Sequence, residues 1–79
     1  MILQILATKT CSHRAKLERM LQQEEIEYEV VYLEDHPDLQ EKYQIFHSPN
    51  LLKDGEIVFR AHPGASLPSA MELKSILGL

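Results

Sequence analysis

The sequence has a single cysteine and no long apolar segment, and both features restrict what the protein can be. Cys11 is the only cysteine among 79 residues, so no disulfide can form within the chain. One cysteine argues against a secreted, disulfide-stabilised domain and favours a reducing compartment. No apolar run approaches the about 20 residues that span a bilayer, and the N-terminal residues lack the features of a signal peptide. We therefore expect one cytoplasmic domain, residues 1–79, that does not act at a membrane.

Positive charge is scarce in this chain and unevenly placed. The formal net charge is −4, which argues against a nucleic acid as the main partner. Eight acids and no Lys or Arg lie between Glu24 and Glu41. The basic residues around the cysteine are Lys9, Arg14, Lys16 and Arg19. We interpret Lys16, Glu18 and Arg19 as a solvated helix face, which leaves Lys9 and Arg14 as the cations closest to the thiol.

Hydrophobic periodicity predicts a strand, a helix and a second strand in the first half of the chain. Residues 2–7 are apolar on both faces, which is typical of a strand buried on both sides. Residues 12–23 have helical spacing, and their apolar stripe consists of Leu17, Met20 and Leu21. Residues 26–33 alternate in polarity, and the outward Glu27 and Glu29 suit an exposed sheet edge. Two parallel strands joined by one helix form a right-handed βαβ unit.

The second half of the chain predicts a short helix and then a β-hairpin. Residues 35–38 open the helix, with Pro37 near its first position. Two side chains of this helix face inward, Leu39 and Tyr43. Residues 50–53 and 56–61 form the two strands of the hairpin, and the Asp54-Gly55 pair between them favours a primed turn.

A last helix completes the predicted order of elements. Ser69 and Glu72 have the spacing of a capping box, and Pro68 is an equally good first helical residue. The apolar side of this helix consists of Met71, Leu73, Ile76 and Leu77. The chain contains no repeat, linker or low-complexity segment, so the order is β-α-β-α-β-β-α.

Cys11 lies where the first strand passes into the first helix. Backbone N–H groups there have no partner within the helix, and the helix dipole is positive, so a thiolate is stabilised. Lys9 and Arg14 add fixed positive charge, and protonated His13 adds a third cation. These surroundings indicate a nucleophilic cysteine rather than an inert buried one.

Several segments, in order, resemble a small thioredoxin-fold protein of glutaredoxin size. Residues 10–14 (Thr-Cys-Ser-His-Arg) follow the first strand, where that family has its Cys-x-x-Cys motif. Residues 47–50 (His-Ser-Pro-Asn) match the segment that holds the family's cis-proline. Residues 54–58 match its hairpin, and Gly64 matches the loop after the hairpin. The resemblance implies a thioredoxin-like α/β fold, with a mixed four-stranded sheet flanked by three helices.

The chain departs from this family at the second cysteine of the motif, whose position is occupied by Arg14. In the two-cysteine mechanism the second thiol releases the substrate from a mixed disulfide. Here an external thiol such as glutathione must do so, as in single-cysteine glutaredoxins. Residues 11–14 also differ from the Cys-Gly-Phe-Ser sequence of that group, which argues against a shared iron–sulfur cluster.

Arg14 falls on the same helical stripe as Leu17 and Leu21, so its charge needs an explanation. In one interpretation its guanidinium favours the Cys11 thiolate and later binds a substrate carboxylate. In the other interpretation Arg14 is simply exposed in the first turn. Both interpretations stay open at the level of the sequence.

The resemblance also implies a substrate site around Pro49. A cis Ser48–Pro49 bond would expose the backbone of Ser48, and an extended substrate such as glutathione could pair with it. Arg14 would bind one of the glutathione carboxylates. The other candidate substrate-binding residues are Lys9, His13 and Gly64.

Two functions follow as alternatives. The first is a monothiol thiol–disulfide oxidoreductase with Cys11 as nucleophile, no bound cofactor, and glutathione or a protein thiol or disulfide as partner. The second is a redox-inert binding or regulatory module that uses the groove beside Pro49. No residues have metal-ligand spacing, and we expect a monomer.

Overall fold

The structure is a computed structural model that describes residues 1–61 and 67–79. Strands and helices follow the predicted order, with one 3₁₀ turn added after the second strand. Their bounds are β1 Leu3–Ala7, α1 Ser12–Gln23, β2 Glu29–Tyr32, η1 (the 3₁₀ turn) Leu33–Asp35, α2 Pro37–Lys42, β3 Asn50–Lys53, β4 Glu56–Phe59 and α3 Ala70–Leu77. Within the described residues, no helix combines the length and the apolar character needed to cross a membrane.

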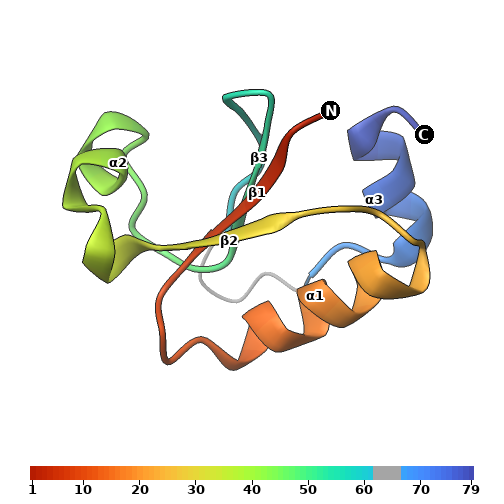
Figure 1. Cartoon of the computed structure of the whole chain (residues 1–79), viewed down its shortest axis with the longest axis horizontal. Coiled ribbons are helices and arrows are strands. Elements are labelled where there is room, and N and C mark those ends of the chain that lie inside the picture. The colour runs from red at the N-terminus through yellow and green to blue at the C-terminus, as the bar shows by residue number, and fades with distance from the viewer. Residues whose placement is uncertain (62–66) are drawn as a thin grey trace.

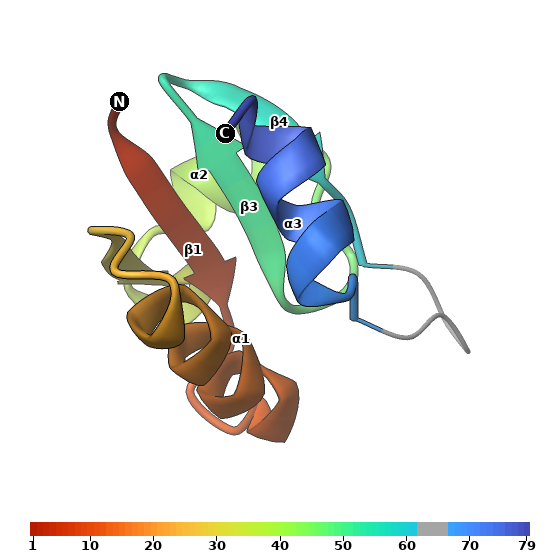
Figure 2. The same ribbon diagram turned by 90° about the vertical axis from the view of Figure 1, so that its right-hand side faces the viewer.

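The four strands form one mixed sheet in the order β2-β1-β3-β4. β1 pairs in parallel with β2 and antiparallel with β3, which pairs antiparallel with β4. α1 and α3 cover one face of the sheet and α2 covers the other, so the molecule has three layers (Figures 1 and 2). This arrangement confirms the predicted α/β class, with a mixed four-stranded sheet flanked by three helices.

β1 lies in the middle of the sheet and is buried on both faces, as its apolar sequence predicts. Leu3, Ile5 and Ala7 pack on the side of α1 and α3, whereas Leu6 packs on the side of α2. The helical members of the first core cluster are Leu17, Leu21, Leu73 and Leu77. β1 and α1 share this core, so the turn that connects them is held at both ends.

α3 begins at the predicted capping box. The Ser69 hydroxyl accepts a hydrogen bond from the Glu72 N–H (3.2 Å) and donates one to the Glu72 carboxylate (3.3 Å). Pro68, the alternative first residue, precedes the cap and is buried. The prediction that Met71 belongs to the apolar side is wrong: its side chain is 82% exposed. Leu73 and residue 77, four positions apart, occupy the buried stripe instead.

Three strands are shorter than predicted: β1 by its first residue, and β2 and β4 at an end where a neighbouring backbone N–H is bonded elsewhere. β2 starts later, since the Ile26 N–H donates to the Leu21 carbonyl at the end of α1 (2.9 Å). β4 ends earlier, since the Ala61 N–H donates to the Asn50 side chain (3.0 Å). The first hydrogen bond belongs to the end of α1, and the second joins the residues after β4 to the start of β3, so neither N–H is available to extend its strand.

The hairpin between β3 and β4 turns as predicted. Asp54 and Gly55 both have positive φ (50° and 86°), which a primed two-residue turn requires. The turn also holds the start of the chain: the Ile2 N–H donates to the Asp54 carboxylate (2.7 Å), and the Asp54 N–H donates to the Ile2 carbonyl (2.8 Å). The hairpin thereby fixes the position of β1 in the sheet.

Candidate active site

Cys11 is the N-cap residue of α1 and has extended backbone dihedrals (φ −76°, ψ 111°). Its N–H donates to the Thr8 carbonyl (3.2 Å), which closes the turn between β1 and α1. The Cys11 side chain caps no backbone N–H; it is half-buried and packs against the core between α1 and α3. The thiol therefore lies at the N-terminal end of α1, where the backbone N–H groups have no partner within the helix.

The turn that leads to Cys11 is held from two sides. On one side, the Thr8 N–H donates to the Ser48 hydroxyl (3.1 Å). On the other side, the Lys9 N–H donates to both oxygens of the Glu34 carboxylate (3.0 and 3.2 Å). The Lys9 ammonium pairs with Asp35 (3.1 Å). Lys9, predicted as a substrate cation, is thus engaged with a carboxylate of the protein itself.

Arg14 is not simply exposed, as the second interpretation from the sequence supposes, and the anion that contacts it belongs to the protein itself. Its guanidinium forms an ion pair with Glu18, four residues along α1, and lies 5.7 Å from the ring centroid of Tyr32 on β2. The Arg14 side chain is only 21% exposed. Its Nε is buried without a hydrogen-bond partner among the described residues. The anion that Arg14 meets is therefore Glu18, and the Cys11 thiol is not among its hydrogen-bond partners in the described chain.

Glu18 is a site residue that the sequence interpretation missed. It was assigned to a solvated helix face, yet its side chain is only 21% exposed and also accepts a hydrogen bond from the Tyr28 hydroxyl (3.0 Å). Gln22 donates to the same hydroxyl (2.8 Å). Positions 14, 18 and 22 are spaced by four, so one face of α1 carries the whole network. This spacing of four residues is the feature of the sequence from which the contact between Arg14 and Glu18 could have been predicted.

The environment of Tyr28 changes its acidity. Burial raises the pKa of Tyr28 above its usual value of 10.0, and the hydrogen bond and negative charge of Glu18 raise this pKa further. The hydrogen bond from Gln22 and the positive charge of Arg14 lower it, but the shift is upward. Arg14, Glu18, Gln22 and Tyr28 therefore form one polar cluster on the side of α1 that faces β2.

The segment beside the Cys11 turn contains a cis Ser48–Pro49 bond, and Pro49 is buried. Asn50 follows it, and its side chain is fully buried (0% exposed). The Asn50 amide donates to the carbonyls of His47 (2.7 Å) and Leu6 (3.3 Å), and its oxygen accepts from the N–H of residue 61 (3.0 Å). One side chain thus joins the end of β1, the cis-proline segment and the residues after β4.

This arrangement of elements is found in a solved structure. Thioredoxin 1 from the thermophilic eubacterium Thermosipho africanus matches with a TM-score of 0.62 over 99% of this chain and 91% of that chain, at 18% sequence identity. The chain has a thioredoxin-like fold. At this identity the likeness shows the fold alone, because one fold supports many functions. No protein-family model and no curated protein matches the sequence.

The thioredoxin-like fold brings only some of the predicted site residues to one place. Cys11 and Ser48 belong to two adjoining loops that a hydrogen bond connects through Thr8. His13 is exposed and lines a hollow further along α1. Gly64 lies outside the described residues. Among residues 1–61 and 67–79, no group of three or more His, Cys, Asp or Glu side chains is placed to hold a metal ion.

Phe46 is a further surface feature that the sequence analysis did not single out. Its side chain is 80% exposed, three residues before Pro49. Two hollows adjoin it, one of about 540 Å³ on the side of α2 and one of about 370 Å³ that is also lined by Arg60. Arg60 donates to the Gln44 carbonyl (2.8 Å) in the segment that carries Phe46. The thioredoxin-like fold therefore presents an aromatic ring near the cis-proline segment.

Proposed function

We propose that this protein is a thiol–disulfide oxidoreductase of the monothiol type, with Cys11 as its nucleophile. The observation that carries the proposal is the position of Cys11 as the N-cap of α1, half-buried and with its side chain making no cap hydrogen bond. A thiol there benefits from the helix dipole and keeps an open side toward solvent. The cis-proline segment beside this turn supports the proposal, since it is a backbone edge that a substrate could join.

The reaction consists of two thiol–disulfide exchanges. The Cys11 thiolate attacks one sulfur of a substrate disulfide, a Cys11–substrate disulfide forms, the substrate S–S bond breaks, and the second sulfur leaves as a thiolate that takes a proton. A glutathione thiolate then attacks the mixed disulfide, and Cys11 leaves as a thiolate. When the group that Cys11 takes from the substrate disulfide is itself glutathione, the substrate is released as a thiol, one glutathione thiol is consumed, and the second product is glutathione disulfide. With any other disulfide, the second exchange yields a glutathione–substrate disulfide. Cys11 ends as it began.

Substrate binding follows from which groups near Cys11 are already engaged. The Ser48 hydroxyl is bonded to the Thr8 N–H, so the backbone of Ser48, rather than its side chain, would pair with glutathione. Lys9 and Arg14 would have to share their charge between Asp35 or Glu18 and the glutathione carboxylates. We therefore propose weak, salt-sensitive glutathione binding, with His13 as a more distant cation.

The pH dependence of Cys11 alkylation by iodoacetamide tests this proposal. The Cys11 thiol of the folded chain should react faster near neutral pH than a free cysteine, because it lies at the start of α1. The same chain unfolded in urea is the matched reference, because its cysteine has the same neighbours in sequence. Cys11→Ser gives the background rate and should abolish disulfide exchange. A folded chain that reacts no faster than the unfolded one would refute the proposal.

A redox-inert binding module is the second candidate, and Phe46 is the observation that favours it. An aromatic side chain that is 80% exposed next to two hollows is typical of a contact surface. In this alternative, Cys11→Ser leaves partner binding intact, and the folded and unfolded chains are alkylated at the same rate.

We propose a reducing compartment such as the cytoplasm as the place of action, since a half-exposed thiol stays reduced there. The proposed partner is glutathione or a protein thiol or disulfide, with no nucleic acid and no membrane involved. The net charge of −4 opposes self-association, so we propose a monomer.

A further inference from the structure

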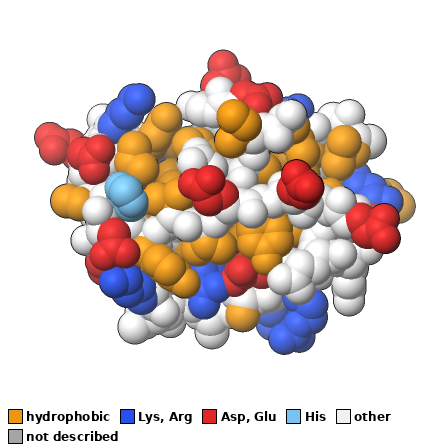
Figure 3. All heavy atoms as spheres, in the orientation of Figure 1, with side chains coloured by type: hydrophobic (Ala, Val, Ile, Leu, Met, Phe, Trp, Pro, Cys, Tyr) orange, Lys and Arg blue, Asp and Glu red, His pale blue; other side chains and the backbone are white. Residues whose placement is uncertain are grey.

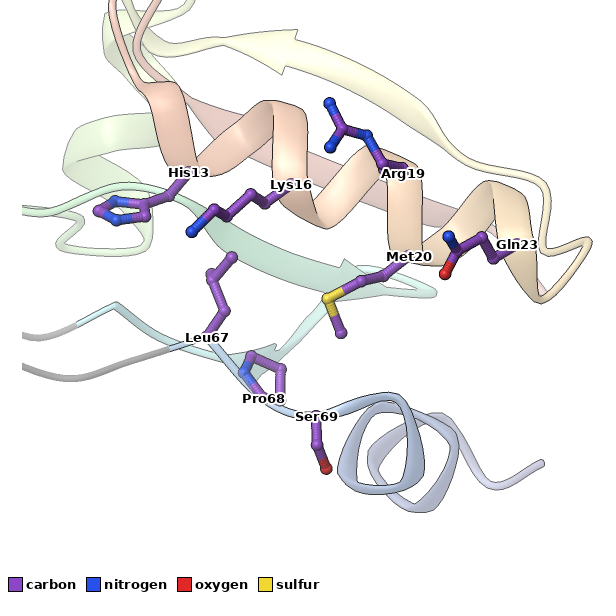
Figure 4. A pocket seen from close by; sticks show the side chains of 8 residues that line it. All are labelled: His13, Lys16, Arg19, Met20, Gln23, Leu67, Pro68 and Ser69. Carbon is purple, nitrogen blue, oxygen red and sulfur yellow. The ribbon is translucent and has the colours of Figure 1, made fainter.

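A hollow of about 460 Å³ lies between α1 and the residues that lead into α3. Its floor is apolar. Met20, Leu67 and Pro68 line it, and their side chains point toward one another across the gap (Figure 4). Met20 and Leu67 are half-buried and pack against the core between α1 and α3, and Pro68 is buried. We call this hollow the α1–α3 groove.

The rim of the α1–α3 groove is basic. His13, Lys16 and residue 20 follow one another at helical spacing, so one stripe of α1 carries an imidazole and an ammonium next to an apolar side chain. In Figure 4, the ends of the His13 and Lys16 side chains lie near one another beside Leu67, whereas the Arg19 guanidinium lies on the side of α1 that faces away from Met20, Leu67 and Pro68. Among the described residues that line the groove there is no Asp or Glu.

Lys16 and Arg19 stand out from the other basic residues of the chain. Of the eight Lys and Arg side chains, three pair with a carboxylate, two donate to a backbone carbonyl and one lies over an aromatic ring. Within the part of the chain that the structure describes, only Lys16 and Arg19 have no such partner. Both line the same groove. Three of the other six cations are neutralised by carboxylates, whereas the charges of Lys16 and Arg19 are available to an anion.

We propose that the α1–α3 groove binds an acidic peptide segment of a partner protein, with one apolar side chain of that segment on the floor. Carboxylates of the segment would face the Lys16 ammonium, and Arg19, three residues further along α1, adds to the positive potential at this rim, so the charges are complementary. The volume of about 460 Å³ lies within the range of about 300–1,000 Å³ typical of ligand sites. A second copy of this chain suits the groove less well, because each copy carries a net charge of −4.

The groove begins two residues beyond Cys11, so a partner bound there lies beside the thiol. Docking itself uses no sulfur chemistry and does not depend on the proposed oxidoreductase function. Cys11→Ser should therefore bind the peptide as tightly as the natural chain, whether or not Cys11 is reactive. Failure of docking and failure of the thiol chemistry are in this way observed separately.

The test is a ¹⁵N–¹H NMR titration of the full chain with the peptide acetyl-Glu-Leu-Glu-Glu-Leu-Glu-amide. We expect saturable shifts of the amides of Lys16, Met20 and Leu67, and weaker binding as salt is added. Two control peptides, with Gln in place of Leu and with Lys in place of Glu, should bind at least about tenfold more weakly. Shifts confined to the surroundings of Phe46 or Cys11, or no saturation at millimolar peptide, would overturn the proposal.

A pair of matched variants separates the groove from general electrostatics. Lys16→Glu should weaken peptide binding about tenfold, because it removes an attraction and adds a repulsion. Lys42→Glu makes the same charge change on α2, which covers the opposite face of the sheet (Figure 2), and should leave binding unchanged. Equal weakening in both variants would contradict a defined site. Concentration-dependent self-association through the groove without peptide would show that a second copy is the occupant and would also overturn the proposal.

Discussion

The start of α1 and the α1–α3 groove both carry basic side chains, but those at the start of α1 are paired with carboxylates and those at the groove are not. Near Cys11, Lys9 is paired with Asp35 and Arg14 with Glu18. One turn further along the same helix, Lys16 and Arg19 have no carboxylate partner among the described residues. In the space-filling view, acidic side chains lie across the middle of the face, over β2, and Lys and Arg side chains lie along the lower margin, the side of α1 (Figure 3). Basic residues that are close together in the sequence therefore do not form one continuous positive surface.

The comparison extends to uncharged groups. The Cys11 end depends on a buried, fully bonded amide, Asn50, whereas the groove exposes the amide of Gln23. A bonded polar group stabilises the structure that surrounds it, and an unbonded one at the surface is available to a ligand. Each of the following experiments tests this difference.

The largest effect is expected for Asn50→Ala. Removal of the Asn50 amide leaves two carbonyls and one N–H without their partner in a buried place, so the free energy of unfolding should fall by about 3 kcal/mol. Gln23→Ala, the matched loss of an amide in the groove, should change it by less than about 0.5 kcal/mol. Urea unfolding followed by circular dichroism measures both values. Equal losses would remove the distinction between the two regions.

A smaller effect is expected where the same substitution is made at two places on α1. Arg14→Gln leaves the half-buried Glu18 without its cation and should lower the free energy of unfolding by about 1–2 kcal/mol. Arg19→Gln should lower it by less than about 0.5 kcal/mol. The measurement is again urea unfolding, at low and at high salt. If Arg19→Gln cost as much as Arg14→Gln, then Arg19 would have a partner that contradicts its place on the groove rim.

The smallest effect concerns the pH dependence of stability through Tyr28. Its pKa is raised in the folded chain, so the unfolded chain loses this proton at a lower pH. The stabilisation is therefore complete below about pH 10 and is lost as the pH rises through the folded pKa. Tyr28→Phe should remove this part of the alkaline loss of stability.

Two measurements check the Tyr28 prediction. Urea unfolding between neutral and alkaline pH compares the natural chain with Tyr28→Phe, and tyrosinate absorbance follows the titration directly. Glu18→Gln should move the Tyr28 titration to lower pH, because the carboxylate that raises its pKa is gone. An unchanged titration in Glu18→Gln would mean that Glu18 does not act on Tyr28.

The elements that were correctly predicted depend on residues close together in the chain. The bounds of α1, the capping box of Ser69 and Glu72, and the positive φ of Asp54 all agree with the structure. Helical spacing, caps and turn dihedrals are determined by neighbours within a few residues. The exposed Met71 shows the limit of a prediction from local pattern. α3 has more apolar residues than its buried stripe has positions, and the pattern does not say which of them is left out.

The site was only partly predictable for the same reason. The position of Cys11 at the strand-to-helix junction follows from periodicity, and the structure places it at the N-cap. The pairing of Arg14 with Glu18 had a local signal in their spacing of four residues. The stacking of Arg14 on Tyr32 and the hydrogen bond from Tyr28 had none, because β2 reaches α1 only when β1 and β2 pair in parallel.

By itself, the sequence determined the order of strands and helices, the turn of the hairpin and the place of the only thiol at the start of a helix. These features depend on periodicity and backbone dihedrals, which act over a few residues. Only the tertiary structure decided that Lys9 is paired with Asp35, which polar groups Asn50 holds, and that Lys16 and Arg19 border an apolar groove. Such contacts join residues far apart in the chain, and they exist only once the sheet register and the packing of α1 against α3 are set.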